Sequence, residues 1–561
     1  MVLLLVMVDR LYIIFQWSVL WSNLDRNQNH NKEVCMAKLR PVTFWPAFIC
    51  LVLTVAYTLI DKQNFITGTS SLNTMIMANL SWLFNLSALF MVFIAAYAFF
   101  APIGRVRIGG ESASQMLTPF RWFAVSLTTV IAMGILFWSV AEPVLHYHEP
   151  PAYLGIIPES PEAMRFSMST IFVHWTITPY SIYTVAGLAF ALAFHNLKLP
   201  FSIGSMLRPI LGRWVDGVGG QIVDGLALFA VVLGMSATLT SGLLVISDGM
   251  ESVLGIQKST TGYAIIAIVI IGAALISAAS GLHRGIQNLA RINTWLYFVG
   301  AIFIFIVGPT AFILSLGVES LGVYLSDFFA RNLVTGASGN DPWPGWWTVA
   351  FFASWFAWAP LSCLFLGKIA RGYTVRQFIM VNLLLPSAFG FVWFSIFSGS
   401  SLFFDTTMGG IMYQAYQDNG FASVIYVLFD QLPGSTILSA LFIFACFITF
   451  VTAADSTTDA IGGLCIQGVD AENLTSPIWV KTIWGCAVAF VAWISASFIG
   501  TDAIKMLFNL SGVPGMLIVL GAGFSFLKLA RRVEINGDIV ELKPTLSADI
   551  KKNSEPSHSI T

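Results

Sequence analysis

The chain has 561 residues, of which 57% are hydrophobic and only 10% are charged, and its mean hydropathy is +0.78. Soluble domains carry roughly 25% charged residues, so this composition excludes a string of soluble domains and indicates an integral membrane protein. The formal net charge is −1, from 28 basic and 29 acidic residues, and it offers no basic field for binding nucleic acid.

Residues 1–35 form an apolar stretch, interrupted by Asp9 and Arg10, and then a polar run that ends just before Met36. A signal peptide would carry its positive charge ahead of the apolar segment and would end in a small-residue cleavage site, and neither is present. We expect an N-terminal appendage, either the product of a misplaced initiation site or an interfacial anchor. The rest divides into a membrane core, 36–527, and a mobile cytoplasmic tail, 528–561.

Some twelve segments are long and apolar enough to cross a bilayer, which takes about 20 residues for about 30 Å of hydrocarbon. The sequence therefore predicts an all-α membrane protein with about twelve transmembrane helices. The predicted spans are 43–61, 79–102, 122–141, 166–195, 222–248, 262–279, 295–316, 346–366, 378–404, 436–454, 481–499 and 505–527.

The connecting segments differ in their basic residues. Taken alternately and with the tail, one set carries fourteen Lys or Arg, whereas the other carries only Lys62, Arg165, Lys258 and Arg331. Basic loops stay in the cytoplasm, so both ends of the core are expected on the cytoplasmic side of a bacterial inner membrane. The same count places segment 142–165, with Glu142, outside as an exposed acidic loop.

Two spans contain residues that interrupt helices. The third span holds Ala132, Met133 and Gly134, and the eighth holds Trp355, Trp358 and Pro360. Irregular backbone at membrane depth survives only beside protein or a water-filled cavity, and the two spans are five helices apart. This spacing favours two inverted five-helix repeats, helices 3–7 and 8–12, each with a broken first helix, after two N-terminal helices. The alternative is that these are the glycines and prolines common in any membrane helix.

The segment 280–293, SGLHRGIQNLARIN, has its apolar residues at helical spacing and its arginines elsewhere. Such a segment should lie along the cytoplasmic interface. It is either an amphipathic helix linked to a gate or a simple surface connector.

Aromatic residues make up 14% of the chain, and interfacial belts explain only some of them. Two clusters lie within spans: Trp175, Tyr180 and Tyr183 in the fourth, and Trp355 and Trp358 in the eighth. Taken singly, each ring is an ordinary packing residue. Together, rings from two helices can surround a quaternary ammonium or sulfonium group, which has no N–H to donate. No carboxylate occurs between positions 128 and 138, which favours zwitterions that bring their own anion.

Two ionisable residues lie within predicted spans. His174 is either a proton carrier or a structural histidine held by hydrogen bonds. Asp455 belongs either to an ion pathway or to a helix break.

Five stretches carry a resemblance to a known family: FWSVAEPVLHY (137–147), VHWTITPYSIYTVAGLA (173–189), GIQNLARINTWL (285–296) with the following GPT, SWFAWAPLSCLFLGKIARGYTVRQFI (354–379) and FVTAADS (450–456). Together they resemble the betaine/choline/carnitine transporter family across nearly the whole core. The resemblance implies twelve helices in a LeuT-like inverted repeat, a homotrimer, and uptake of trimethylammonium or sulfonium solutes.

The resemblance also implies a substrate site. Its aromatic box corresponds to Trp175, Tyr180, Tyr183, Trp355 and Trp358, with Tyr180 where the family usually has Trp. The glycine-rich stretch of the family's third helix is here Ala132, Met133 and Gly134, so bare backbone approaches the substrate at fewer positions.

A sodium site is implied between the third and tenth helices, at Thr128, Ile131, Thr449 and Thr452. Ala453 supplies no hydroxyl where the family usually has Ser, which weakens the set of oxygen ligands. The family's sodium-independent exchangers carry instead an Arg in the fifth helix, and residues 222–248 contain no Lys or Arg. We therefore expect sodium as the coupling ion, with exchange and proton coupling as alternatives.

The sequence thus predicts a secondary transporter that imports glycine betaine, dimethylsulfoniopropionate, carnitine or choline-type solutes by alternating access. It predicts no enzyme and no cofactor, because no nucleophile elbow, phosphate-binding loop or metal-ligand pair occurs in usable context. A transporter-like sensor is a further alternative.

Overall fold

The computed structural model describes residues 39–131, 134–280, 283–467 and 476–536. Among these residues there is no strand, only two isolated β-bridges. Ten described helices are long and apolar enough to cross a membrane, and an eleventh crossing is formed if the bent pair 291–307 and 310–326 counts as one. The prediction of an all-α membrane protein is confirmed.

The long helices follow the predicted spans. They are α2 (Pro41–Ile60), α3 (Lys62–Phe100), α4 (Pro119–Ile131), α5 (Gly134–His148), α6 (Pro161–Trp175), α7 (Ile177–Ala191), α9 (Val218–Leu254), α10 (Thr260–Ser280), α11 (His283–Val307), α12 (Thr310–Ser326), α15 (Thr348–Ile369), α17 (Leu385–Thr407), α20 (Ser435–Cys465), α21 (Ile478–Phe498) and α22 (Thr501–Asn536). Short helices join them: α8 (Arg208–Leu211), α13 (Phe328–Asn332), α14 (Trp343–Trp346), α16 (Val375–Ile379), α18 (Ile411–Asn419) and α19 (Val424–Asp430).

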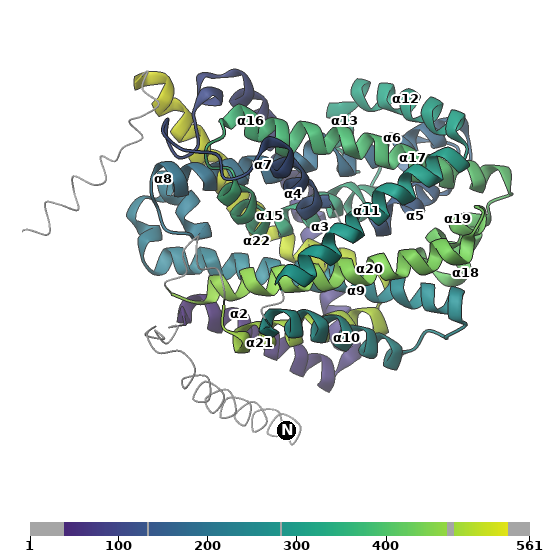
Figure 1. The fold of residues 1–561 in the computed structure, drawn as a ribbon. Coiled ribbons are helices and arrows are strands. Elements are labelled where there is room, and N and C mark those ends of the chain that lie inside the picture. The colour runs from purple at the N-terminus through teal and green to yellow at the C-terminus, as the bar shows by residue number, and fades with distance from the viewer. Residues whose placement is uncertain (1–38, 132–133, 281–282, 468–475, 537–561) are drawn as a thin grey trace, which may run out of the picture.

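Helix α9 lies in the middle of the bundle and packs against α20, α21, α22 and α2. Figure 1 shows α20 beside it, with α2, α21 and α10 along the lower face and α6, α12 and α17 at the upper right. Helix α15, the predicted eighth span, is held between α7 and α22. The two helices that carry the predicted aromatic box are therefore neighbours.

The prediction that the eighth span is interrupted is wrong, because α15 continues through Pro360. A proline removes the N–H that would bond the carbonyl four residues earlier, here Phe356. Gly515 of α22 packs directly over this carbonyl, so closely that a Cβ at Gly515 would lie 2.1 Å from the Phe356 oxygen. In membrane proteins, glycine commonly allows a neighbouring helix to approach closely, and such neighbours help a helix to tolerate an internal proline.

The seventh span also differs from its prediction. The chain bends by 104° between α11 and α12, at Gly308 and Pro309, so 295–316 is not one straight crossing. The predicted interfacial segment 280–293 is not a separate helix either, because α11 runs from His283 through Asn293 to Val307. At the C-terminal end, α22 continues beyond the predicted core to Asn536.

Candidate functional site

The fourth span is broken at Thr176, next to the predicted aromatic residues. Helix α6 ends at Trp175, Thr176 has φ −124° and ψ −120°, and α7 begins at Ile177. The last carbonyls of a helix have no partner within that helix. One of them, the carbonyl of His174, accepts a hydrogen bond from Trp355 Nε1 of α15 at 3.1 Å. The break therefore creates the acceptor that fixes a ring of the neighbouring helix.

Three of the other four predicted box residues converge on Trp355. Its ring centre lies 4.7 Å from that of Tyr183, 5.0 Å from that of Tyr180 and 5.9 Å from that of Trp175. All four side chains are buried. The rings are in mutual contact, so a guest between them requires the rings to separate.

The fifth residue, Trp358, makes no ring contact with these four. It lies one turn after Trp355, and its indole faces Gly234 of α9. Ala132 and Met133 lie outside the described residues, and the side-chain environments of Thr128, Ile131 and Gly134 are also not described.

Glu142 is buried in the interior, and the prediction of an exposed loop at this position is wrong. Helix α5 runs on to His148, so the carboxylate of Glu142 is fully covered, whereas Glu149 and Glu162 beyond it are exposed. Its Oε2 accepts a hydrogen bond from Trp175 Nε1 at 3.2 Å. An aromatic ring of the box is thus joined directly to a buried negative charge.

Two histidines adjoin the same carboxylate. His174 Nδ1 lies 2.5 Å from Glu142 Oε1, and its Nε2 lies 3.0 Å from Thr348 Oγ1 of α15. His146, one turn after Glu142, places Nε2 3.4 Å from Oε1. All three side chains are fully buried. The interpretation of His174 as a hydrogen-bonded histidine therefore agrees with the structure.

This triad, Glu142, His146 and His174, is the group of described residues whose ligand atoms come close enough to consider a metal ion. Ligand atoms about 2 Å from a tetrahedral metal lie about 3.3 Å from one another. The separation of 2.5 Å between Glu142 Oε1 and His174 Nδ1 is instead that of a direct hydrogen bond. The geometry fits a shared proton better than a metal.

Of the predicted sodium ligands, Thr449 and Thr452 lie on successive turns of α20. The hydroxyl of Thr449 donates to the Ala445 carbonyl at 2.8 Å and accepts from Asn293 Nδ2 of α11 at 2.6 Å. The hydroxyl of Thr452 bonds the carbonyls of its own helix, at Ile448 and Thr449. In this conformation Thr449 is engaged with α11, and its role as a sodium ligand stays a prediction.

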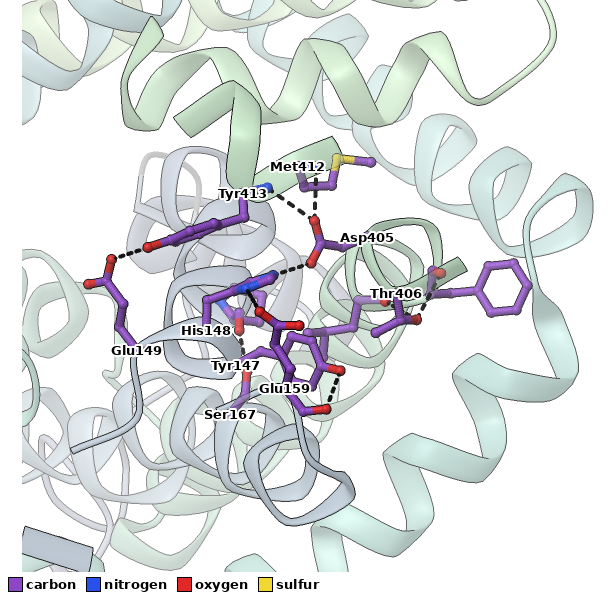
Figure 2. Close-up of polar contacts among 12 residues, drawn as sticks. Tyr147, His148, Glu149, Glu159, Ser167, Asp405, Thr406, Met412 and Tyr413 are labelled. Carbon is purple, nitrogen blue, oxygen red and sulfur yellow. Dashed lines mark hydrogen bonds and ion pairs between the residues drawn. The ribbon is translucent and has the colours of Figure 1, made fainter. Parts of the chain in front are cut away.

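A second polar group, the His148 cluster, consists of His148, Glu159, Asp405 and Tyr413 (Figure 2). The ring of His148 bonds Asp405 Oδ2 at 2.6 Å and Glu159 Oε1 at 3.1 Å, and it stacks on Tyr413 at 4.1 Å. Buried Asp405 also accepts hydrogen bonds from the backbone N–H groups of Met412 and Tyr413. The cluster joins the end of α5 to the junction of α17 and α18.

Comparisons with known proteins agree with this architecture. A family model described as "BCCT, betaine/carnitine/choline family transporter" matches residues 41–534. The chain belongs to this family. It is 31% identical to a probable glycine betaine transporter of Desulfitobacterium hafniense, over 91% of this chain and 98% of that protein. It is 28% identical to an ectoine/hydroxyectoine transporter of Virgibacillus pantothenticus (88% and 97% covered) and to a high-affinity choline transport protein of Escherichia coli (89% and 72% covered).

The BCCT family is a family of transporters rather than of enzymes, and the relatives of this chain are named as transporters. Sequence reasoning found the rings of the box but missed the burial of Glu142. A carboxylate just beyond a predicted span is normally interpreted as a loop residue. The available signal was the spacing of Glu142 and His146, which places both on one face of a continued helix.

Proposed function

We propose that this BCCT transporter imports small zwitterionic quaternary-ammonium or sulfonium solutes, such as glycine betaine, dimethylsulfoniopropionate or carnitine, by alternating access. The observation that carries the proposal is the convergence of Trp175, Tyr180 and Tyr183 on Trp355 at the break in the fourth span. An onium group cannot donate hydrogen bonds, and each desolvated contact with a ring face is worth about 0.5 to 2 kcal/mol.

Glu142 gives the box the carboxylate that segment 128–138 lacks, so the support for a zwitterion is now the presence of opposite charges around the box. Glu142, bonded to Trp175, supplies a negative charge on the side of the onium group. Lys505 of α22 supplies a positive charge, with Nζ 3.5 Å from the ring centre of Trp347. Phe351 lies between them, 6.4 Å from Trp347 and 5.3 Å from Trp175. A solute with a cationic and an anionic end would meet a complementary charge for each.

Sodium is the coupling ion that we propose, with Thr128, Ile131, Thr449 and Thr452 as its ligands. The fifth span, within α9, contains no Lys or Arg that could replace the ion, which argues against sodium-independent exchange. Proton coupling and a solute sensor without net transport are the alternatives. Sodium binding would favour closure over bound solute, because an ion shifts the equilibrium toward the state that it binds better.

We further propose a homotrimer in the bacterial inner membrane, with both ends of the core in the cytoplasm. The support for this orientation is the excess of Lys and Arg on one set of connecting segments. The support for the trimer is membership of the family.

The test is uptake into proteoliposomes of labelled glycine betaine, dimethylsulfoniopropionate, carnitine, choline and ectoine, with and without an inward sodium gradient. Accumulation of one onium solute that requires sodium is the expected result. Accumulation driven only by internal solute would indicate exchange, and binding without accumulation would indicate a sensor. Failure of every onium solute to bind or move would overturn the proposal.

A further inference from the structure

Beyond transport itself, we propose that the triad of Glu142, His146 and His174 is a proton-binding site, and that a proton there and an onium solute in the aromatic box bind antagonistically. The inference rests on the proposed onium function, which it deepens. Its evidence is the hydrogen bond through which Trp175 joins the triad to the box.

The hydrogens of the triad can be assigned from its contacts. With Glu142 ionised, its two oxygens accept hydrogen bonds from His174 Nδ1 and Trp175 Nε1, and His146 Nε2 lies 3.4 Å from Oε1 without a hydrogen bond. His174 Nε2 is then free to accept from the Thr348 hydroxyl. The unprotonated triad therefore has one net negative charge and one hydrogen-bond donor on each oxygen of the carboxylate.

The triad also has room for one more proton. Neither ring nitrogen of His146 has a hydrogen-bond partner among the described residues. The His146 ring packs 4.5 Å from Trp347 and 4.9 Å from Trp343, and indole faces stabilise an imidazolium. His174 offers a second place, because the Thr348 hydroxyl can rotate to accept from a protonated Nε2.

A cavity lies beside residues that contact the triad. It has a volume of about 190 Å³ and is lined by Phe166, Trp343 and Thr348, among others. These residues contact the two histidines: Thr348 bonds His174, and Phe166 and Trp343 pack against His146. The cavity thus brings solvent-sized space up to the partners of both imidazoles.

The charged groups that face the triad come from other helices. Lys505 of α22 lies over Trp347, the same ring that His146 contacts. Arg331 of α13 lies over Phe166, with Asp327 as its ion-pair partner in the wall of the cavity. Both cations favour the ionised carboxylate and oppose an added proton, whereas Glu149, Asp502 and Asp327 lie beyond them and offset part of their field.

The link to the box is the indole of Trp175. Its N–H bonds the carboxylate while its ring lies beside Trp355, so an onium group on that ring would lie about 7 Å from the triad. At this distance and an effective dielectric constant of about 20, neutralising the carboxylate weakens the binding of a cation by more than about 10-fold. Because such coupling is reciprocal, a bound onium group must expel the proton to the same extent.

The first experiment needs no solute. Infrared difference spectra of the purified full-length protein are recorded between about pH 5 and 8, for the wild type, Glu142→Gln and His146→Gln. We expect carboxylate and imidazole bands that change with pH in the wild type and are absent or shifted in both variants. His148→Gln, which changes a histidine on the same helix outside the triad, should lose only the bands of His148 itself and keep the pH-dependent bands that Glu142→Gln and His146→Gln remove. A wild-type protein with no such pH-dependent bands would overturn the inference whatever the solute.

The second experiment measures the binding of labelled glycine betaine over the same pH range. Affinity should fall by more than about 10-fold as pH falls, both in the wild type and in His148→Gln. In Glu142→Gln, which keeps an oxygen for Trp175, affinity should be low and independent of pH, and His146→Gln should flatten the profile if the Glu142 variant does not fold. Wild-type affinity that is constant with pH overturns the antagonism and leaves the proposed function intact. Absence of onium binding at every pH overturns both.

Discussion

Trp355 Nε1 of α15 donates a hydrogen bond to the backbone carbonyl of His174 on α6, across 181 positions of the chain. This carbonyl is available because α6 stops at Trp175, one residue before the break at Thr176. The hydroxyl of Thr176 satisfies a second freed carbonyl, that of Phe172. The break in one helix and the ring orientation in the next are therefore parts of a single arrangement.

Replacing Trp355 by Ala should weaken onium binding by about 1 to 3 kcal/mol, because it removes the ring on which the other three converge. Trp358→Ala should have a smaller effect, since that indole faces Gly234 of α9 instead. Equilibrium binding of the labelled solute to both purified variants measures the difference. Equal losses, or a larger loss in Trp358→Ala, would contradict the placement of the box.

Replacing Ala453 by Ser should strengthen sodium dependence, because a second hydroxyl would then stand beside Thr452 on α20. Thr452→Val should have the opposite effect. Sodium activation curves for uptake into proteoliposomes compare the two, with Ala454→Ser, at the neighbouring position, as the control. Unchanged curves for both Ala453→Ser and Thr452→Val would rule out this placement of the ion.

Gly515→Ala should destabilise the protein by about 1 to 3 kcal/mol, because the added methyl group would meet the Phe356 carbonyl of α15 at 2.1 Å. Gly272→Ala is the matched control, since a methyl group at that position of α10 meets nothing within 4 Å. Thermal unfolding in detergent should show a lower midpoint for the first variant only. Similar midpoints for both would mean that α22 does not pack tightly over Pro360.

Asp405→Ala should cost about 2 to 4 kcal/mol of stability, because it leaves the N–H groups of Met412 and Tyr413 and the ring of His148 without their acceptor. The loss should appear in the same unfolding assay. Thr406→Ala, at the neighbouring position, should change stability much less, since its hydroxyl only bonds carbonyls of its own helix. Equal stability of Asp405→Ala and the wild type would be the contrary result.

The His148 cluster also predicts a pH dependence of stability. His148 is the last residue of α5 and lies outside the candidate spans. Burial by itself lowers its pKa, but the hydrogen bond and charge of Asp405, with Glu159, outweigh burial and raise the pKa above its usual value. The folded protein therefore holds this proton more tightly than the unfolded chain does.

The stabilisation from protonated His148 should be complete below about pH 6.5 and should disappear as pH rises through the raised pKa. The measurement is the unfolding midpoint of the wild type minus that of His148→Gln, as a function of pH. A difference that grows with rising pH would have the wrong sign.

The sequence determined the class of the protein and most of its spans, and it predicted the rings of the proposed site, because hydrophobic length and residue type act locally. An apolar run of about 20 residues has few alternatives to a membrane helix, and Trp175, Tyr180, Tyr183 and Trp355 lie in such runs. The resemblance to the family placed these rings in one site, and family membership was then confirmed.

Only the tertiary structure decided which helix breaks and which charges are buried. Pro360 was expected to interrupt the eighth span, but α15 continues through it, and Gly515 packs over the Phe356 carbonyl that the proline leaves without a donor. A break occurs instead in the fourth span, at Thr176. Glu142 was expected in an exposed loop because it lies just beyond a predicted span, in a segment that the count of basic residues places outside. It is buried instead, and His174 and Trp175 contribute the donors that make this burial possible. Whether backbone and charge can be buried depends on partners from other helices, and those partners are far away in the sequence.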